Sequence, residues 1–112
     1  MAESIALAVL ENLVHMSRQD FPTGYVCVAA DLPDDLRILS EHELRRRYKL
    51  NELNSKTLGD WWIDSLTSAV LMVPSTVIPG GSNYLLNPAH QDFSKIAIEP
   101  PALFHFDARL FG

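Results

Sequence analysis

Glu11 is the one carboxylate inside an apolar stretch that begins at Ile5 and ends at Val14. A buried carboxylate is costly unless it is hydrogen-bonded or performs a chemical task, so Glu11 is a candidate catalytic group. The alternative is that Glu11 lies on a solvent-facing stripe of a helix, with Asn12 and His15 beside it. The position of the residue alone favours that second interpretation.

A second group of polar side chains lies in and after the segment Val73–Pro79, namely Ser75, Asn83, Asn87 and His90. One hydroxyl and two amides without a nearby charge suit a polar, neutral part of a ligand, such as a ribose or a carboxamide. The alternative is that these are turn residues, because Ser and Asn favour such positions. Spacing alone favours turns.

Other reactive side chains form no recognisable site. The four histidines, His15, His42, His90 and His105, lack metal-ligand spacing, and Cys27 is the only cysteine. We therefore expect no metal and no internal disulfide, and a reducing compartment suits the single thiol. The sequence also has no Gly-rich phosphate loop, no Gly-x-Ser-x-Gly motif and no Cys/His pair.

Two further clusters have structural interpretations. Arg45–Arg47 is offset by Glu41, Glu43 and Glu52, which predicts a solvated helix face. Trp61–Trp62 is expected to anchor a helix in the core, although one ring could form a pocket wall.

The elements that position these residues begin with a helix over Ser4–Arg18 and a strand over Tyr25–Ala29. Ser40 with Glu43 fits a capping box that opens a helix to about Arg47. Ser55 or Thr57 opens another helix, which runs through the two tryptophans to about Leu66.

The remaining third of the chain reads as strands. Ala69–Val73 is a buried strand stopped by Pro74, and the turn Pro79–Gly81 leads to an extended piece, Tyr84–Leu86. Lys95–Glu99 and Leu103–Asp107 follow as two more strands. This order of elements predicts an α+β fold with a mostly buried sheet.

Composition limits the protein class. The 112 residues (12.6 kDa) fit one domain, and nine basic against fourteen acidic residues give a net charge of −5, which argues against direct nucleic-acid binding. Asp31–Asp64 holds 14 of the 23 charges and is expected to be solvated surface. The acidic N-terminus does not resemble a signal peptide, and the charge-free run Leu66–Gln91 contains prolines and glycines unsuited to a membrane helix. We expect a cytoplasmic protein that contacts no membrane.

The segments Leu58–Trp62, Ala69–Pro79 and Asn83–His90 together closely resemble the RES domain, a family named for an arginine, a glutamate and a serine. Upstream, Ala6–Glu11 is similar to the family's glutamate-bearing helix. Downstream, Phe106–Leu110 is similar to its closing Asp-Pro-Arg-Leu, with alanine in place of proline. The resemblance therefore runs almost from end to end.

The resemblance implies an ADP-ribosyltransferase-like mixed sheet with flanking helices. It also implies a toxin of a bacterial toxin–antitoxin pair that degrades NAD+, as a phosphorylase or glycohydrolase, and is bound by an Xre-like helix-turn-helix antitoxin. Carried over residue by residue, Glu11 and Ser75 are expected to be catalytic, and Asn83 and Asn87 to bind substrate. NAD+ would be the substrate and phosphate a possible co-substrate, with no further cofactor.

The resemblance also contains a departure. The family's arginine, in a Gly-Arg-Trp-Asn-like segment, and a tyrosine in a strand just before the glutamate-bearing helix would both precede Met1. Residues 1–112 are therefore expected to be a single RES-type domain lacking its N-terminal strands, with weak or no activity in this form. The alternatives are a catalytically inactive RES domain that still binds an Xre-type antitoxin, and an unrelated small-ligand-binding domain.

Missing strands would leave a sheet edge and apolar helix surface open, including some of Ile5, Val9 and Leu13. We therefore expect a second copy or the antitoxin to cover this surface. Glu11 and Ser75 are expected to line one cleft despite their separation of 75 − 11 = 64 positions.

Overall fold

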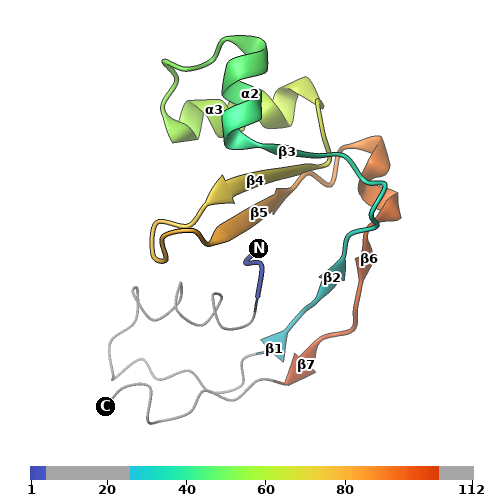
Figure 1. Cartoon of the computed structure of the whole chain (residues 1–112). Helices are drawn as coiled ribbons and strands as arrows, with labels where there is room; N and C mark the ends of the chain where they lie inside the picture. Colours follow the sequence, from blue (N-terminus) through green and yellow to red (C-terminus); the bar gives the residue numbers. More distant parts are fainter. Residues whose placement is uncertain (5–25, 104–112) are drawn as a thin grey trace, which may run out of the picture.

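Two α-helices lie against one face of a three-stranded sheet, and a β-ribbon leads away from it (Figure 1). The computed structural model describes residues 1–4 and 26–103. The helices are α2 (Glu41–Tyr48) and α3 (Ser55–Ser65). The predicted α+β class is confirmed, and the arrangement is consistent with an ADP-ribosyltransferase-like fold.

The central sheet has the order β3 (Ile38–Ser40), β4 (Val70–Pro74) and β5 (Ser82–Leu86). β3 and β4 are parallel because both helices intervene between them, whereas β4 and β5 form an antiparallel hairpin. The predicted strands Ala69–Val73 and Tyr84–Leu86 are thus confirmed with shifted ends, and β3 was not predicted.

The ribbon consists of two short antiparallel pairs that follow one another. β1 (Val26–Cys27) pairs with β7 (Ala102–Leu103), and β2 (Ala30–Asp31) pairs with β6 (Ala97–Ile98). The predicted strands over 25–29 and 95–99 are therefore confirmed only in part. A 3₁₀ helix, Gln91–Lys95, takes up the start of the second one. The predicted strand over 103–107 and the predicted helix over 4–18 lie almost wholly outside the described residues.

Both helices begin at a side-chain cap. At α2 the Ser40 Oγ accepts a hydrogen bond from the Glu43 N–H at 3.1 Å and donates to Glu43 Oε1 at 3.4 Å, so the predicted cap at Ser40 is confirmed and the Glu43 side chain contacts its hydroxyl. At α3 the cap is Asn54, whose Oδ1 accepts from the Thr57 N–H at 2.8 Å. The predicted start of this helix at Ser55 is therefore confirmed, and the residue before it, Asn54, is the cap.

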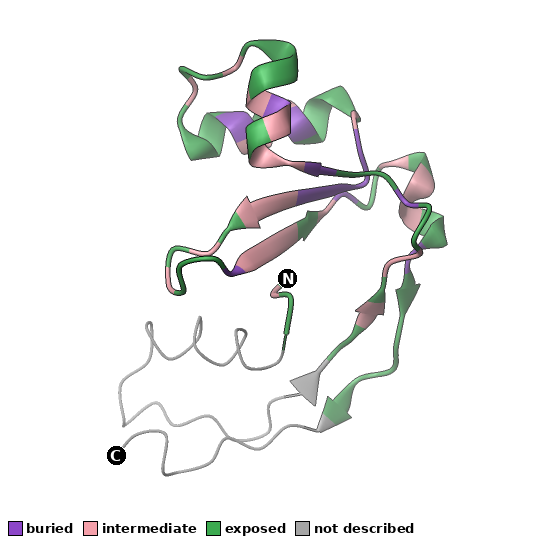
Figure 2. Ribbon diagram, viewed as in Figure 1, coloured by how far each residue is buried: buried purple, intermediate pink, exposed green. Residues whose placement is uncertain are grey.

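The core lies on both sides of β4, because successive side chains of a strand point to opposite faces. Leu71 packs with Leu39 and with the buried faces of the helices, whereas Val70 packs with Ala69 in a second cluster. Figure 2 shows that the buried residues of these three strands lie in β3 and β4 and that the ribbon is more exposed.

The charged segment between residues 31 and 64 contributes to both the surface and the core. Its charged side chains are exposed except for Glu41, Glu43 and Arg45, which are half-buried, so the predicted solvation holds for most of them. The same segment supplies much of the core, namely Leu36, Leu39, Leu44, Leu58 and Trp62.

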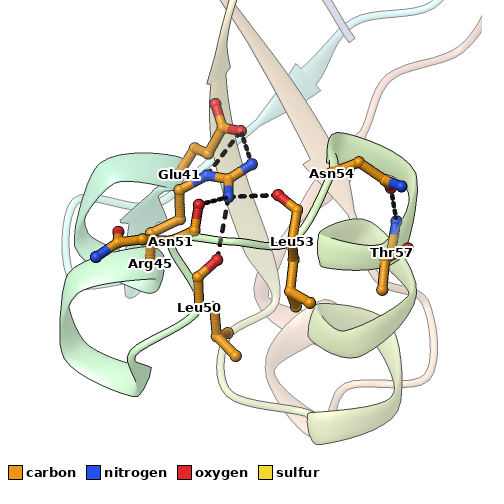
Figure 3. A network of polar contacts seen from close by, with 7 residues as sticks. All are labelled: Glu41, Arg45, Leu50, Asn51, Leu53, Asn54 and Thr57. Atoms are coloured by element: carbon orange, nitrogen blue, oxygen red, sulfur yellow. Dashed lines mark hydrogen bonds and ion pairs between the residues drawn. The ribbon is translucent and has the colours of Figure 1, made fainter.

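Arg45 holds the connection between the helices together (Figure 3). Its Nη1 donates to the carbonyl oxygens of Leu50 (3.1 Å), Asn51 (3.4 Å) and Leu53 (2.7 Å), and its Nε and Nη2 donate to Glu41 Oε1 at 3.3 and 3.1 Å. The prediction of a solvated face over Arg45–Arg47 is therefore wrong for Arg45 and correct for Arg46 and Arg47.

The first residues of the chain add to the free edge of β5. Ala2 forms an antiparallel bridge with Asn83, and the Met1 ammonium donates to the Tyr84 carbonyl at 2.7 Å. The Glu3 N–H donates to the Ser82 carbonyl at 3.3 Å. No helix in the described segments is long and apolar enough to cross a membrane.

Candidate functional site

Ser75 organises the tight loop that joins β4 to β5. Its N–H donates to the Gly81 carbonyl at 2.8 Å, and its Oγ accepts from the N–H groups of Val77 (3.0 Å) and Ile78 (3.1 Å). Gly80, at φ 84°, supplies the left-handed turn that brings the chain back into β5. The predicted turn at Pro79–Gly81 is thereby confirmed.

This geometry limits what the Ser75 hydroxyl can do chemically. A hydroxyl has two acceptor lone pairs and one hydrogen, and the two main-chain N–H groups use both lone pairs. Any further hydrogen bond of the group is one that it donates. Ser75 therefore suits the role of a donor to a ligand oxygen better than that of a nucleophile.

Replacing Ser75 by alanine is expected to loosen this loop. The substitution removes two modest hydrogen bonds, at a cost of about 1–2 kcal/mol, because the freed N–H groups can still reach water. Amide hydrogen exchange at Val77 and Ile78 should accelerate, whereas Ser75→Thr, which keeps the hydroxyl, should preserve protection. Thr76→Ala is the matched control, since Thr76 is exposed and adjacent. Unchanged exchange at both amides in Ser75→Ala would contradict this role.

Asn83 lies close to the Ser75 loop, and Asn87 does not. Asn83 is half-buried and pairs in register with Val73, two residues before Ser75. Asn87 follows the other end of β5, about 13 Å further along at strand spacing. The structure therefore brings Ser75 and Asn83 to one end of the hairpin and places Asn87 at the opposite end.

Asn87 links the end of β5 to helix α3 and to the turn that follows β5. It is 3% exposed, its Nδ2 donates to the Ile63 carbonyl at 3.2 Å, and its Oδ1 accepts from the Ala89 N–H at 3.0 Å. The nearby His90 accepts the Asp92 N–H on Nδ1 at 3.0 Å and so caps the 3₁₀ helix. Asn87 and His90 thus make the hydrogen bonds of turn and capping residues, in agreement with the turn interpretation.

Glu11 lies outside the described residues. Its predicted position in one cleft with Ser75 therefore stays a prediction, as does the exposure of Ile5, Val9 and Leu13 near it. Within residues 1–4 and 26–103, no three His, Cys, Asp or Glu side chains gather closely enough to hold a metal ion.

The tryptophan pair has a structural role. Trp62 is 1% exposed and donates from Nε1 to Ser68 Oγ at 2.9 Å, as predicted for a core anchor. Trp61 is half-buried and packs on Tyr48, with ring centroids 5.1 Å apart and planes tilted by 46°.

Two acidic side chains meet on the β-ribbon. A hydrogen bond with Asp31, and then repulsion by its charge, raise the pKa of Glu99 above the ordinary value of 4.5. The folded chain therefore binds the Glu99 proton more tightly than the unfolded chain does. The resulting stabilisation is present below pH 4.5 and is lost as the pH rises through the raised pKa.

Glu99→Gln is expected to remove this pH dependence. The variant should lose less stability than the parent between acidic and neutral pH, because glutamine keeps a hydrogen-bonding group and cannot acquire the charge. Urea unfolding below pH 4.5 and at neutral pH measures the difference. Glu52→Gln, an exposed carboxylate elsewhere, serves as the control and should leave the pH profile unchanged. Identical profiles for Glu99→Gln and the parent would count against the contact.

The fold and the hairpin site define a small α+β domain with a serine-organised loop at the end of its central hairpin. The RES domain family model matches residues 1–107, a range that includes both Glu11 and Ser75. The chain belongs to the RES domain family.

Three relatives are similar over nearly the whole chain. "Toxin Res" of Yersinia enterocolitica is 31% identical over 114 residues, covering 98% of this chain and 75% of the relative. "Toxin Res" of Pseudomonas putida is 34% identical over 108 residues, covering 93% and 72%. The "Prs ADP-ribosylating toxin" of a Sphingobium strain is 30% identical over 115 residues, covering 97% and 71%.

One structural residue was missed by sequence reasoning. Arg45 was grouped with its two arginine neighbours, although Glu41 precedes it by four positions, which is the spacing of a helical ion pair. That spacing could have distinguished Arg45 from the solvent-exposed Arg46 and Arg47 in the sequence analysis.

Proposed function

We propose that this chain is the toxin of a bacterial toxin–antitoxin pair and that it acts by degrading NAD+. The observation that carries the proposal is the family match over residues 1–107, together with relatives that are named toxins. Further support comes from the relative named as an ADP-ribosylating toxin. Transfer of an ADP-ribosyl group and degradation of NAD+ both begin with cleavage of the bond between nicotinamide and ribose.

In the proposed reaction the nicotinamide leaves with the electron pair of its bond to the ribose and becomes neutral. The ribosyl carbon acquires positive charge in the transition state, as in glycoside hydrolysis. Phosphate or water then supplies the oxygen that forms the new bond, and water loses a proton in doing so. These two acceptors correspond to phosphorolysis and hydrolysis.

The proposed residue roles follow from the chemistry of the groups. The Glu11 carboxylate would hold the ribose hydroxyls and stabilise the developing positive charge. Ser75 would donate a hydrogen bond to an oxygen of the substrate, since two main-chain N–H groups use its lone pairs. Asn83, at the same end of the hairpin, would contribute its amide to binding. Asn87 would act indirectly, by fixing the far end of β5.

The proposed partner is an Xre-like helix-turn-helix antitoxin that covers the substrate site. The second candidate function is that of a catalytically inactive RES domain that retains this partner. A complex with the antitoxin that forms without any loss of NAD+ would support it. We propose that activity requires the arginine and the tyrosine that the family resemblance implies, so assays should compare residues 1–112 with the chain extended by any in-frame codons that precede Met1.

Induction of the extended chain in bacterial cells tests the proposal. Cellular NAD+ should fall before growth stops, and co-expression of a candidate Xre-like helix-turn-helix antitoxin should prevent both effects and yield a complex with the chain. Growth arrest at a constant NAD+ concentration would contradict the proposed chemistry. A complex without any loss of NAD+ would favour the second candidate.

A further inference from the structure

An open hollow of about 460 Å³ lies between the start of α2 and the β4–β5 hairpin. Its walls include Ser40, Glu41, His42, Arg45, Met72 and Ser82. The size falls within the range of small-molecule sites. Ser82 is the register partner of Pro74, the residue before Ser75, so the hollow adjoins the proposed site without including Ser75 itself.

Glu41 is held in one orientation at the wall of this hollow (Figure 3). Its Oε1 accepts from two nitrogens of Arg45, and Arg45 is itself fixed by three main-chain carbonyls. No hydrogen bond from the described part of the chain reaches Oε2 of Glu41. Within the described residues, the wall of the hollow thus has a half-buried, preoriented carboxylate, one oxygen of which accepts no hydrogen bond.

Met72 provides an apolar wall, and the exposed His42 makes no hydrogen bond or ion pair within the described residues. Arg45 is also in the wall, but its guanidinium is already bound to Glu41 and to three carbonyls. A sugar with adjacent hydroxyls could donate to Glu41 Oε2 and pack its ring on Met72, whereas a sugar with a phosphate in place of one hydroxyl would lose that donor and bring negative charge next to the carboxylate. A charge-assisted hydrogen bond of this kind is among the stronger polar contacts in proteins.

We propose that the hollow binds the ribose of a nucleoside through Glu41 Oε2. The inference rests on the proposed function and deepens it: beside the Ser75 loop, the hollow takes the adenosine ribose of NAD+. The same carboxylate would disfavour NADP+, because that dinucleotide carries a phosphate on the adenosine ribose. Glu41 thereby becomes a specificity-determining residue.

Equilibrium binding of two unreactive probes, ADP-ribose and 2′-phospho-ADP-ribose, tests the inference by calorimetry on the full chain. The parent should bind ADP-ribose about tenfold more tightly than the phosphorylated probe. Glu41→Gln should weaken ADP-ribose binding by about tenfold and reduce the discrimination. Addition of ADP-ribose should also shift the NMR signals of the His42 ring.

Glu43→Gln is the matched control, because it removes the same charge from the same helical turn and Glu43 does not line the hollow. It should bind both probes as the parent does. A thermal unfolding curve confirms that each variant is folded. If Glu41→Gln is unfolded, Glu41→Asp takes its place; it keeps the charge but draws it back by one methylene, and it should weaken ADP-ribose binding.

Equal binding of ADP-ribose by Glu41→Gln and the parent would overturn the inference, and so would a parent that binds neither probe. The proposed function is measured separately, by loss of cellular NAD+. NAD+ loss with unaltered binding in Glu41→Gln would refute the ribose site alone, whereas tight, Glu41-dependent binding without NAD+ loss would refute the proposed reaction alone.

Discussion

Replacing Trp62 by alanine is expected to lower the free energy of unfolding by about 3–5 kcal/mol. The indole is 1% exposed and packs in the cluster with Leu39, Leu44, Leu58 and Leu71. Its removal leaves a cavity that the surrounding helix and sheet cannot fill. It also takes away the donor to the buried Ser68 hydroxyl, which itself donates to the Val70 carbonyl at 2.8 Å. Urea unfolding followed by circular dichroism measures the loss.

Trp61→Ala is the matched control for this prediction. The two residues are adjacent and identical in type, but Trp61 is half-buried and contacts Tyr48 near the surface. Its replacement should cost clearly less than that of Trp62. Trp62→Phe should fall between the two, because it keeps most of the ring and loses the N–H. Equal losses at positions 61 and 62 would refute the assignment of Trp62 as the core anchor.

Glu11→Gln is expected to reduce NAD+ consumption by about 10²- to 10³-fold in the extended chain. Glutamine preserves the size and hydrogen-bonding capacity of the side chain and removes the charge that would face the positive ribosyl carbon. The rate of NAD+ loss measures the effect, and a circular dichroism spectrum like that of the parent excludes unfolding as its cause.

Glu3→Gln is a suitable control, since Glu3 also lies near the N-terminus and its Oε1 accepts from the Ser82 N–H, a bond that glutamine can retain. It should leave the rate almost unchanged. If Glu11→Gln were as active as the parent, the catalytic role carried over from the family would be wrong. Ser75→Ala should reduce the rate less, because it removes a neutral donor.

The local parts of the fold were predictable because their signals lie within a few residues. The cap of α2 by Ser40 involves residues three positions apart, and the structure confirms it. The start of α3 at Ser55 was predicted from the same kind of local signal. β3 was missed because a three-residue strand between charged residues has no alternation long enough to detect.

The contacts of Arg45 and the order of the strands in the sheet could not be predicted, for a different reason. The carbonyls that bind Arg45 belong to a loop whose path follows from the packing of α2 against α3, so no sequence pattern indicates them. Parallel pairing of β3 with β4 likewise depends on how two helices cross the sheet. Both features arise from tertiary structure.

The sequence indicated which residues could belong to the candidate site better than it indicated what each of them does. The hydroxyl of Ser75 was interpreted either as a ligand group or as a turn residue, and the contacts show the turn role. Asn83 and Asn87 were grouped by type and spacing, yet they lie at opposite ends of β5. Residue types indicate which chemical groups are present, whereas the strand register determines which of these residues lie side by side.

The concentration of NAD+ over time, measured with the purified extended chain in the presence and absence of phosphate, tests the central claim most directly. We predict that NAD+ disappears and nicotinamide accumulates in equal amount, with ADP-ribose as the second product in water and its phosphorylated counterpart when phosphate is the acceptor. Residues 1–112 alone should show weak or no turnover. An unchanged NAD+ concentration with the folded, extended chain under both conditions would contradict the claim.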